Sequence, residues 1–231
     1  MSTRPLFPFY GSKWNTARYY PAPRQPLVIE PFAGSAGYSL FHGCRKVWLF
    51  DADPVIAGLW EYLINVSESE ILGLPLLPNE GDSVEGLSLP QEAKWLIGFW
   101  LNRGSASPKL SRTAYSARSD RGQLNWGERA RARVASGLSA VRDWAVTCAP
   151  YIEAPDVVAT WHVDPPYVDK GKFYRVPFRA FDTLGEWCET RRGQVMVCEN
   201  SGADWLPFQP LGSFKSSKGR SQEVLYLKET P

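Results

Sequence analysis

The stretch that decides the fold is "QPLVIEPFAGSAGYSLFHGCRKVWLFDADP", residues 25–54. It contains a short apolar run that ends at Glu30, a glycine-rich turn, the helix-like segment "YSLFHG", and a second apolar run that ends at Asp51. The next segment, "VIAGLWEYLINV", has apolar residues at helical spacing. Strands that alternate with helices favour an α/β fold with a parallel sheet.

The alternation stops at about residue 67. Residues 67–90 are dominated by Gly, Pro, Ser and acids, "QEAKWLIGFWLN" is typical of a helix, and residues 104–127 form a polar segment rich in Ser and Arg. A longer helix is expected next, with Val134, Leu138, Val141 and Ala145 on one apolar stripe. We therefore expect residues 67–155 to be a small helical and loop insertion between two parts of one domain, 1–66 and 156–231.

The second part of that domain repeats the strand pattern. An apolar run precedes Asp164, a helix is expected at about residues 178–191, and "GQVMVCEN" is typical of a strand. A final strand pair is expected in "LGSFKSS" and "QEVLYLKE". A chain of 231 residues suits one such domain with its insertion.

Composition excludes several classes of protein. No apolar run approaches the roughly 20 residues needed to span a bilayer, and the first residues, "MSTRPLFPFYGSK", lack the apolar stretch of a signal peptide. We expect a soluble, cytoplasmic, monomeric protein without a membrane partner. Four scattered cysteines and two histidines lack the spacing of zinc ligands, so no metal is expected.

Positive charge is concentrated in the expected insertion. Residues 103–133 hold eight basic and two acidic residues. A solvated surface is the ordinary interpretation of such a run, but its polar, Ser-rich setting favours a phosphate-backbone partner. Candidate nucleic-acid contacts are Arg103, Lys109, Arg112, Arg118 and Arg121.

The glycine-rich turn predicts a cofactor site. Gly34 and Gly37 allow a ligand to approach the backbone where a strand turns into a helix. Asp51 ends the next strand, where an acid accepts hydrogen bonds from ribose hydroxyls. The fingerprint G-x-G-x-x-G is absent, and the turn has no basic residue to meet a pyrophosphate. Glu30 and Asp51 therefore favour a cationic, adenosine-bearing cofactor such as S-adenosylmethionine, whereas Asp53 is either a further contact or only a helix cap.

A second candidate site is "DPPY", formed by Asp164, Pro165, Pro166 and Tyr167. A double proline ends a strand and stiffens the chain just after it, because proline has a fixed φ and no backbone N–H. The simplest interpretation is a strand terminus. The alternative is a rigid clamp that presents a carboxylate, a carbonyl and an aromatic face to one ligand.

Four motifs, "FYGSKW", "EPFAGSAGYSL", "DADP" and "DPPY", occur in the order found in DNA adenine methylases. The sequence resembles this family over residues 5–66 and 156–228, and it is most similar to the compact, phage-type members. The resemblance implies a Rossmann-like methyltransferase sheet, S-adenosylmethionine as cofactor, and double-stranded DNA as partner.

The resemblance also implies roles for single residues. Lys13 matches a lysine that contacts the methionine end of the cofactor, with Phe9 or Tyr10 as its aromatic neighbour. The turn that wraps the cofactor matches Phe32, Ala33, Gly34, Ser35 and Gly37, and Asp51 matches the acid that binds the ribose.

In the acceptor site, the Asp164 carboxylate and the Pro165 carbonyl would accept hydrogen bonds from the amino group of a flipped adenine, which makes its nitrogen a better nucleophile. Tyr167 would stack on the flipped base, and Asp164 also borders the cofactor. Lys170 and Lys172 are expected near the flipped nucleotide.

The sequence thus predicts an enzyme, an adenine-specific DNA methyltransferase. Two alternatives remain: the same chemistry on RNA adenine or on the cytosine of DNA, and a catalytically silent module that binds the cofactor and DNA. An aspartate at position 164 argues against cytosine, since members of the family that act on cytosine more often have serine there.

Overall fold

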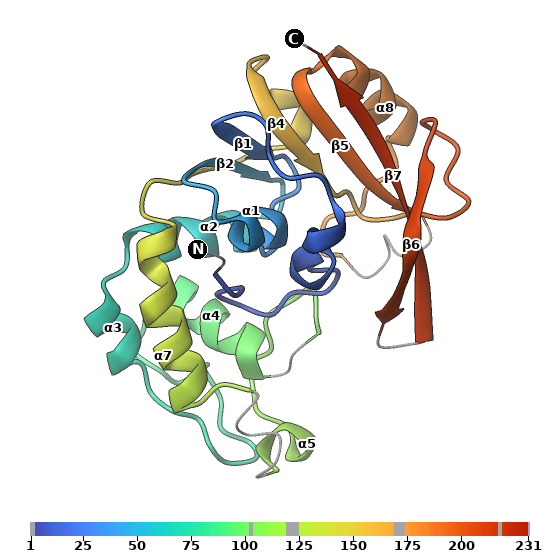
Figure 1. Cartoon of the computed structure of the whole chain (residues 1–231). Coiled ribbons are helices and arrows are strands. Elements are labelled where there is room, and N and C mark those ends of the chain that lie inside the picture. Colours follow the sequence, from blue (N-terminus) through green and yellow to red (C-terminus); the bar gives the residue numbers. More distant parts are fainter. Residues whose placement is uncertain (1–2, 102–103, 119–124, 169–173, 217–218, 231) are drawn as a thin grey trace.

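The structure is a computed structural model, and it describes residues 3–101, 104–118, 125–168, 174–216 and 219–230 (Figure 1). These residues form a mixed α/β fold around a seven-stranded sheet with strand order β3-β2-β1-β4-β5-β7-β6. The strands are β1 (Leu27–Glu30), β2 (Lys46–Asp51), β3 (Ala145–Cys148), β4 (Val158–Val163), β5 (Arg192–Asn200), β6 (Gln209–Ser216) and β7 (Gly219–Glu229). The first five strands are parallel, whereas β7 runs antiparallel to both β5 and β6. The expected parallel α/β sheet is therefore confirmed, and the sheet is compatible with a Rossmann-like fold.

Helices cover both faces of the sheet (Figure 1). They are α1 (Gly37–His42), α2 (Pro54–Asn65), α3 (Glu68–Gly73), α4 (Gln91–Leu101), α5 (Ala114–Ala117), α7 (Glu128–Gly137) and α8 (Phe181–Thr190). Short 3₁₀ helices are η1 (Lys13–Asn15), η2 (Ala17–Tyr19), η3 (Leu138–Ala140) and η4 (Tyr151–Glu153). No helix among the described residues is long and apolar enough to cross a membrane.

Successive residues of one strand enter two different hydrophobic cores, because side chains alternate across a strand. Val28 packs in the core that contains α1, α2 and the inserted helices, whereas Ile29 packs in the core beneath α8. The near-continuous apolar sequence of β1 is what a parallel strand buried on both faces requires.

The inserted segment shares the first of these cores. One buried cluster contains Trp60 of α2, Trp100 of α4 and Val134 of α7. Trp126, which precedes α7, belongs to the same cluster. The insertion is therefore packed onto the sheet domain as a continuation of its core.

Two expectations about the insertion were wrong. Its last helix ends at Gly137, and Ala145 begins β3, which pairs with β2 at the edge of the sheet. The insertion therefore ends before residue 145, not at 155, because a four-residue apolar run cannot be distinguished from a continuing helix by periodicity. Within residues 67–90 the structure has one helix, α3, and Ser67 and Glu70 form its capping box.

Candidate functional site

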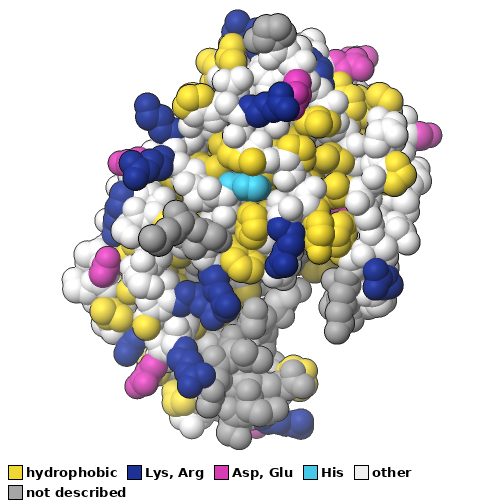
Figure 2. Space-filling view, viewed as in Figure 1, with side chains coloured by type: hydrophobic (Ala, Val, Ile, Leu, Met, Phe, Trp, Pro, Cys, Tyr) yellow, Lys and Arg dark blue, Asp and Glu magenta, His cyan; other side chains and the backbone are white. Residues whose placement is uncertain are grey.

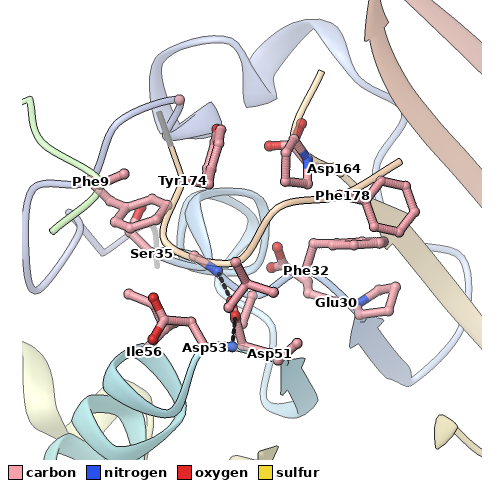
Figure 3. A pocket seen from close by; sticks show the side chains of 18 of the residues that line it. Phe9, Glu30, Phe32, Ser35, Asp51, Asp53, Ile56, Asp164, Tyr174 and Phe178 are labelled. Atoms are coloured by element: carbon pink, nitrogen blue, oxygen red, sulfur yellow. Dashed lines mark hydrogen bonds between the residues drawn. The ribbon is translucent and has the colours of Figure 1, made fainter. Parts of the chain in front are cut away.

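The candidate site lies where the direction of the sheet's connections reverses. Strands β2 and β3 lie on one side of β1, whereas β4 and β5 lie on its other side. Ligands of open α/β sheets bind in the crevice at the carboxyl ends of the strands at such a switch point. A cavity of about 240 Å³ lies there, and it is lined by residues that follow β1, β2 and β4 (Figure 3).

The glycine turn after β1 forms one wall of this cavity. Gly34 has φ 44°, in the left-handed region that favours glycine. A Cβ atom on Gly34 would lie 3.1 Å from the ring of Phe9, so the turn and the N-terminal segment are in close contact. The Gly34 N–H donates to Asp51 Oδ2 over 3.1 Å, which joins this turn to the end of β2 (Figure 3).

Gly37 allows η1 to approach the first turn of α1. A Cβ atom there would lie 2.6 Å from the backbone nitrogen of Trp14. Ser35 Oγ donates to Ser12 Oγ over 2.8 Å at the same contact. This close packing brings Lys13, from η1, into the cavity.

Lys13 forms an ion pair with Asp164, the first residue after β4. Its Nζ lies 2.8 Å from Asp164 Oδ1, and the lysine side chain is only 8% exposed. Burial raises the pKa of the Asp164 carboxyl, and the neighbouring Lys13 ammonium opposes that rise. For Lys13 the balance is reversed: burial alone would lower its pKa, but Asp164 and Glu223 outweigh burial and raise it. The resemblance implied a contact between Lys13 and the cofactor; in the structure its ammonium pairs with Asp164 of the "DPPY" motif.

Tyr167 is held in place from two directions. Its hydroxyl donates to Glu223 Oε2 over 2.6 Å, and Glu223 lies on β7. The Lys13 ammonium lies 4.5 Å from the centre of the Tyr167 ring. Burial raises the pKa of Tyr167 well above its usual value, so the hydroxyl stays protonated.

Asp51 and Asp53 organise the wall formed by the end of β2. Asp51 accepts the N–H groups of Gly34 and Asp53, and burial raises its pKa to about 6. Asp53 caps α2 by accepting the Val55 N–H over 2.9 Å, so the helix-cap interpretation is confirmed, and Asp53 also lines the cavity. Asp53 also pairs with Arg175, whose Nε lies 3.1 Å from Asp53 Oδ2.

Glu30 lines the cavity, and both of its carboxylate oxygens have hydrogen-bond partners within the protein. Its Oε1 accepts the Ser39 N–H over 3.0 Å, and its Oε2 lies 3.1 Å from Nδ1 of the buried His162. The other ring nitrogen of His162 lies 3.6 Å from Cys198 Sγ. Burial alone would lower the pKa of His162, but Cys198 and Glu30 outweigh burial and raise it to about 10. Glu30 and Cys198 therefore contact the two ring nitrogens of His162 from opposite sides.

Aromatic rings line the remainder of the cavity. Phe32 stacks on Tyr151 with 5.7 Å between ring centres, and Phe178 packs edge-on against Phe32 at 5.3 Å. On the other side, Tyr174 lies 6.1 Å from Phe9 and 5.9 Å from Tyr10. Both of the aromatic candidates in the N-terminal motif therefore border the cavity.

Most residues predicted from the sequence are brought together here. The cavity is lined by Phe9, Tyr10, Lys13, Glu30, Phe32, Ala33, Gly34, Ser35, Gly37, Asp51, Asp53, Asp164 and Pro166. Pro165 and Tyr167 continue the same buried segment. Sequence reasoning missed His162, Tyr151 and Phe178, which also line the cavity. Of these three, only His162 could have been found from the sequence, because it is one of two histidines in the chain and lies two residues before Asp164.

The predicted nucleic-acid contacts have different outcomes. Lys109 and Arg118 are exposed. Arg112 was wrongly predicted: its guanidinium is buried and donates to the carbonyls of Leu77 and Trp126, so it holds the insertion together. Arg103, Arg121, Lys170 and Lys172 lie outside the described residues. Within the described ranges, no group of three or more His, Cys, Asp or Glu side chains is arranged to hold a metal ion.

The sequence matches no protein-family model and no curated protein. Among solved structures, the chain is similar to a conserved hypothetical protein of Streptococcus pyogenes, with a TM-score of 0.42 and 12% identity over 95% of this chain and 94% of that chain.

Proposed function

We propose that this chain is an S-adenosylmethionine-dependent DNA methyltransferase that modifies the exocyclic amino group of adenine. The observation that carries the proposal is the position of "DPPY". Its Asp164 lies at the end of β4, in the same crevice as the glycine turn after β1 and the acid after β2. A strand terminus alone does not require these three elements to share one cavity.

The residues present fit an adenosine-bearing, cationic cofactor. Each Asp51 oxygen accepts one backbone N–H, and a carboxylate oxygen has a further lone pair for a ribose hydroxyl. Phe32 and Phe178 offer apolar faces for the adenine ring. The basic residues of the lining, Lys13 and Arg175, are already paired with carboxylates, so the cavity lacks the free cation that a pyrophosphate would need among its described residues.

S-adenosylmethionine supplies an electrophilic methyl group on a sulfonium ion. The task left to the protein is to bind and orient the amino group that receives it. The Asp164 carboxylate and the Pro165 carbonyl accept hydrogen bonds from that amino group, which directs its lone pair toward the cavity. Lys13 keeps Asp164 ionised and fixed without taking part in the transfer.

The acceptor must be a base removed from its helix. Asp164, Pro165 and Pro166 are buried or half-buried, so a base stacked in a duplex cannot reach them. The fixed ring of Tyr167 provides a surface on which the extruded base stacks. Exposed Lys109 and Arg118 on the insertion bind the phosphate backbone.

The test is methyl transfer from labelled S-adenosylmethionine to unmethylated duplex DNA, followed by modification-sensitive sequencing. Methyladenine clustered at one short motif is the expected result. Cofactor binding without any transfer to DNA would contradict the proposal, and transfer to RNA or to cytosine would identify one of the alternatives.

A further inference from the structure

We infer that Tyr19 and Phe214 form a stacking surface for a base of the DNA strand that carries the target adenine. This inference rests on the proposed function and adds a binding surface outside the cavity. The two rings are in contact in a tilted arrangement, with 4.8 Å between their centres and 38° between their planes. Tyr19 is 53% exposed although it is a large aromatic residue, and Phe214 is half-buried.

The pair is connected directly to the acceptor motif. Tyr167 is bonded to Glu223 of β7, and Glu223 pairs with Gly212 of β6. Phe214 lies two residues further along β6, where it pairs with Ser221. The same strand pair therefore binds the Tyr167 hydroxyl through Glu223 and carries Phe214 two residues away.

The N-terminal segment makes a second connection. Tyr20 is buried and packs against His162 in the cavity wall, with 5.8 Å between ring centres. Tyr19, its neighbour, points to the outside. Through Tyr20, the Tyr19–Phe214 pair is connected to the wall of the cavity.

Positive charge accompanies these rings. Arg18 is exposed, and its guanidinium carbon lies 6.0 Å from the centre of the Tyr19 ring. Arg220 is exposed on the opposite strand, and it is bonded to the hydroxyl and carbonyl of Ser213, next to Phe214. Neither arginine takes part in an ion pair among the described residues, in contrast to Arg24, which pairs with Glu229. Two guanidiniums beside an open aromatic face are suited to a strand of phosphates and bases.

The shape of the molecule also favours a duplex. The β6–β7 pair projects past the rest of the sheet, and the inserted segment with α4 and α5 projects on the other side (Figure 1). Figure 2 shows hydrophobic and basic side chains together on this face of the molecule. A duplex bound across both projections would contact the exposed residues of the insertion and the β6–β7 pair, which carries Phe214.

The simpler explanation is that the two rings only fasten η2 to the strand pair. A fastening role predicts lower stability with unchanged DNA affinity, whereas a stacking role predicts weaker DNA binding in a stable protein. The variants are Tyr19→Ser, Phe214→Ser and Tyr19→Phe, with Leu227→Ala as the control. Leu227 is 45% exposed on β7 but lies outside this surface.

The measurements are the Kd for a fluorescent duplex, the KM for DNA, the KM for S-adenosylmethionine and the Tm. Base stacking on an aromatic side chain is typically worth enough to change affinity by about tenfold or more. We expect Tyr19→Ser and Phe214→Ser to raise the Kd and the KM for DNA by about that factor, with the KM for the cofactor unchanged. Tyr19→Phe and Leu227→Ala should behave as the wild type does.

Unchanged DNA affinity in both serine variants would overturn the inference, as would a wild type that binds RNA and not DNA. A wild type that binds duplex DNA without methylating it would contradict the proposed function alone, because the effect of the variants on Kd still tests the stacking surface. A wild type that neither binds nor methylates DNA would overturn both.

Discussion

The ammonium of Lys13 lies 2.8 Å from Oδ1 of Asp164, although the two residues are 151 positions apart in the sequence. The contact joins the N-terminal 3₁₀ helix to the motif that ends β4, and both side chains line the cavity. A buried carboxylate is costly to ionise unless a positive charge accompanies it. In the proposed enzyme, Lys13 therefore sets the pH range in which Asp164 can accept hydrogen bonds.

Replacing Lys13 with methionine is expected to move the acid limb of the pH–rate profile upward. The lysine opposes the rise in the pKa of Asp164 that burial causes, so its removal raises that pKa further. A nearby opposite charge commonly shifts a carboxyl pKa by about one unit or more, and we expect the acid limb to move by at least that amount. The measurement is the initial rate of methyl transfer against pH. Lys13→Arg keeps the charge and should leave the limb near its original position; a limb that does not move in Lys13→Met would refute this role.

His162 is expected to stabilise the protein in a pH-dependent way. Its folded pKa, about 10, lies above its ordinary value of 6.5, so the stabilisation is fully present below about pH 6.5 and is lost as pH rises toward 10. Breaking a buried charged pair costs about 3–5 kcal/mol. We expect His162→Leu to lower the free energy of unfolding by about that amount at pH 6 and by less at pH 9.5, as measured by urea denaturation.

The other histidine provides the control for this experiment. Burial lowers the pKa of His42, so replacing it with leucine should not produce a stability loss that shrinks between pH 6 and pH 9.5. An equal loss at both pH values in His162→Leu would show that His162 is not held as an imidazolium.

Gly37→Ala is expected to destabilise the protein and reduce methyl transfer together. The added Cβ would lie 2.6 Å from the backbone nitrogen of Trp14, so η1 and Lys13 must shift. Overpacking of this kind typically costs about 1–3 kcal/mol. Gly73→Ala, at the end of α3, adds a Cβ with no heavy atom within 4 Å and should not lower the free energy of unfolding. Equal behaviour of the two variants in urea denaturation would contradict the close contact at Gly37.

Arg112 and Arg118 are expected to have opposite phenotypes. Arg112→Met leaves the Leu77 and Trp126 carbonyls without their donor and should cost about 1–3 kcal/mol of stability. Arg118→Met should leave stability unchanged, weaken duplex binding, and reduce the slope of log affinity against log salt by about one. Urea denaturation and binding at several salt concentrations measure the two effects. A stable Arg112→Met variant with weakened DNA binding would reverse the assignment.

The sheet domain could be predicted from local sequence because its signals are local. A βαβ unit of 25 residues consists of β1, the glycine turn, α1 and β2. The structure places β2, β1 and β4 side by side and parallel, so the predicted acids at their carboxyl ends meet at one edge of the sheet. This explains why so many of the predicted cofactor residues line the cavity.

The features that could not be predicted depend on tertiary packing. The burial of Arg112 is decided by the contact between two parts of the insertion, and a run of basic residues does not indicate which member faces inward. The pairing of His162 with Glu30 joins residues on different strands. Tyr151 enters the cavity from η4, a short element without a periodic pattern.

The central claim is tested most directly by identifying the nucleoside that the protein modifies. Unmethylated duplex DNA would be incubated with S-adenosylmethionine and either the wild type or Asp164→Ala, digested to nucleosides, and analysed by mass spectrometry. The account predicts N6-methyldeoxyadenosine with the wild type and a loss of at least about a hundredfold with Asp164→Ala, the scale expected when a transition-state hydrogen-bond acceptor is removed. Undiminished methylation by Asp164→Ala, or no methylated adenine with a wild type that binds the cofactor, would contradict it.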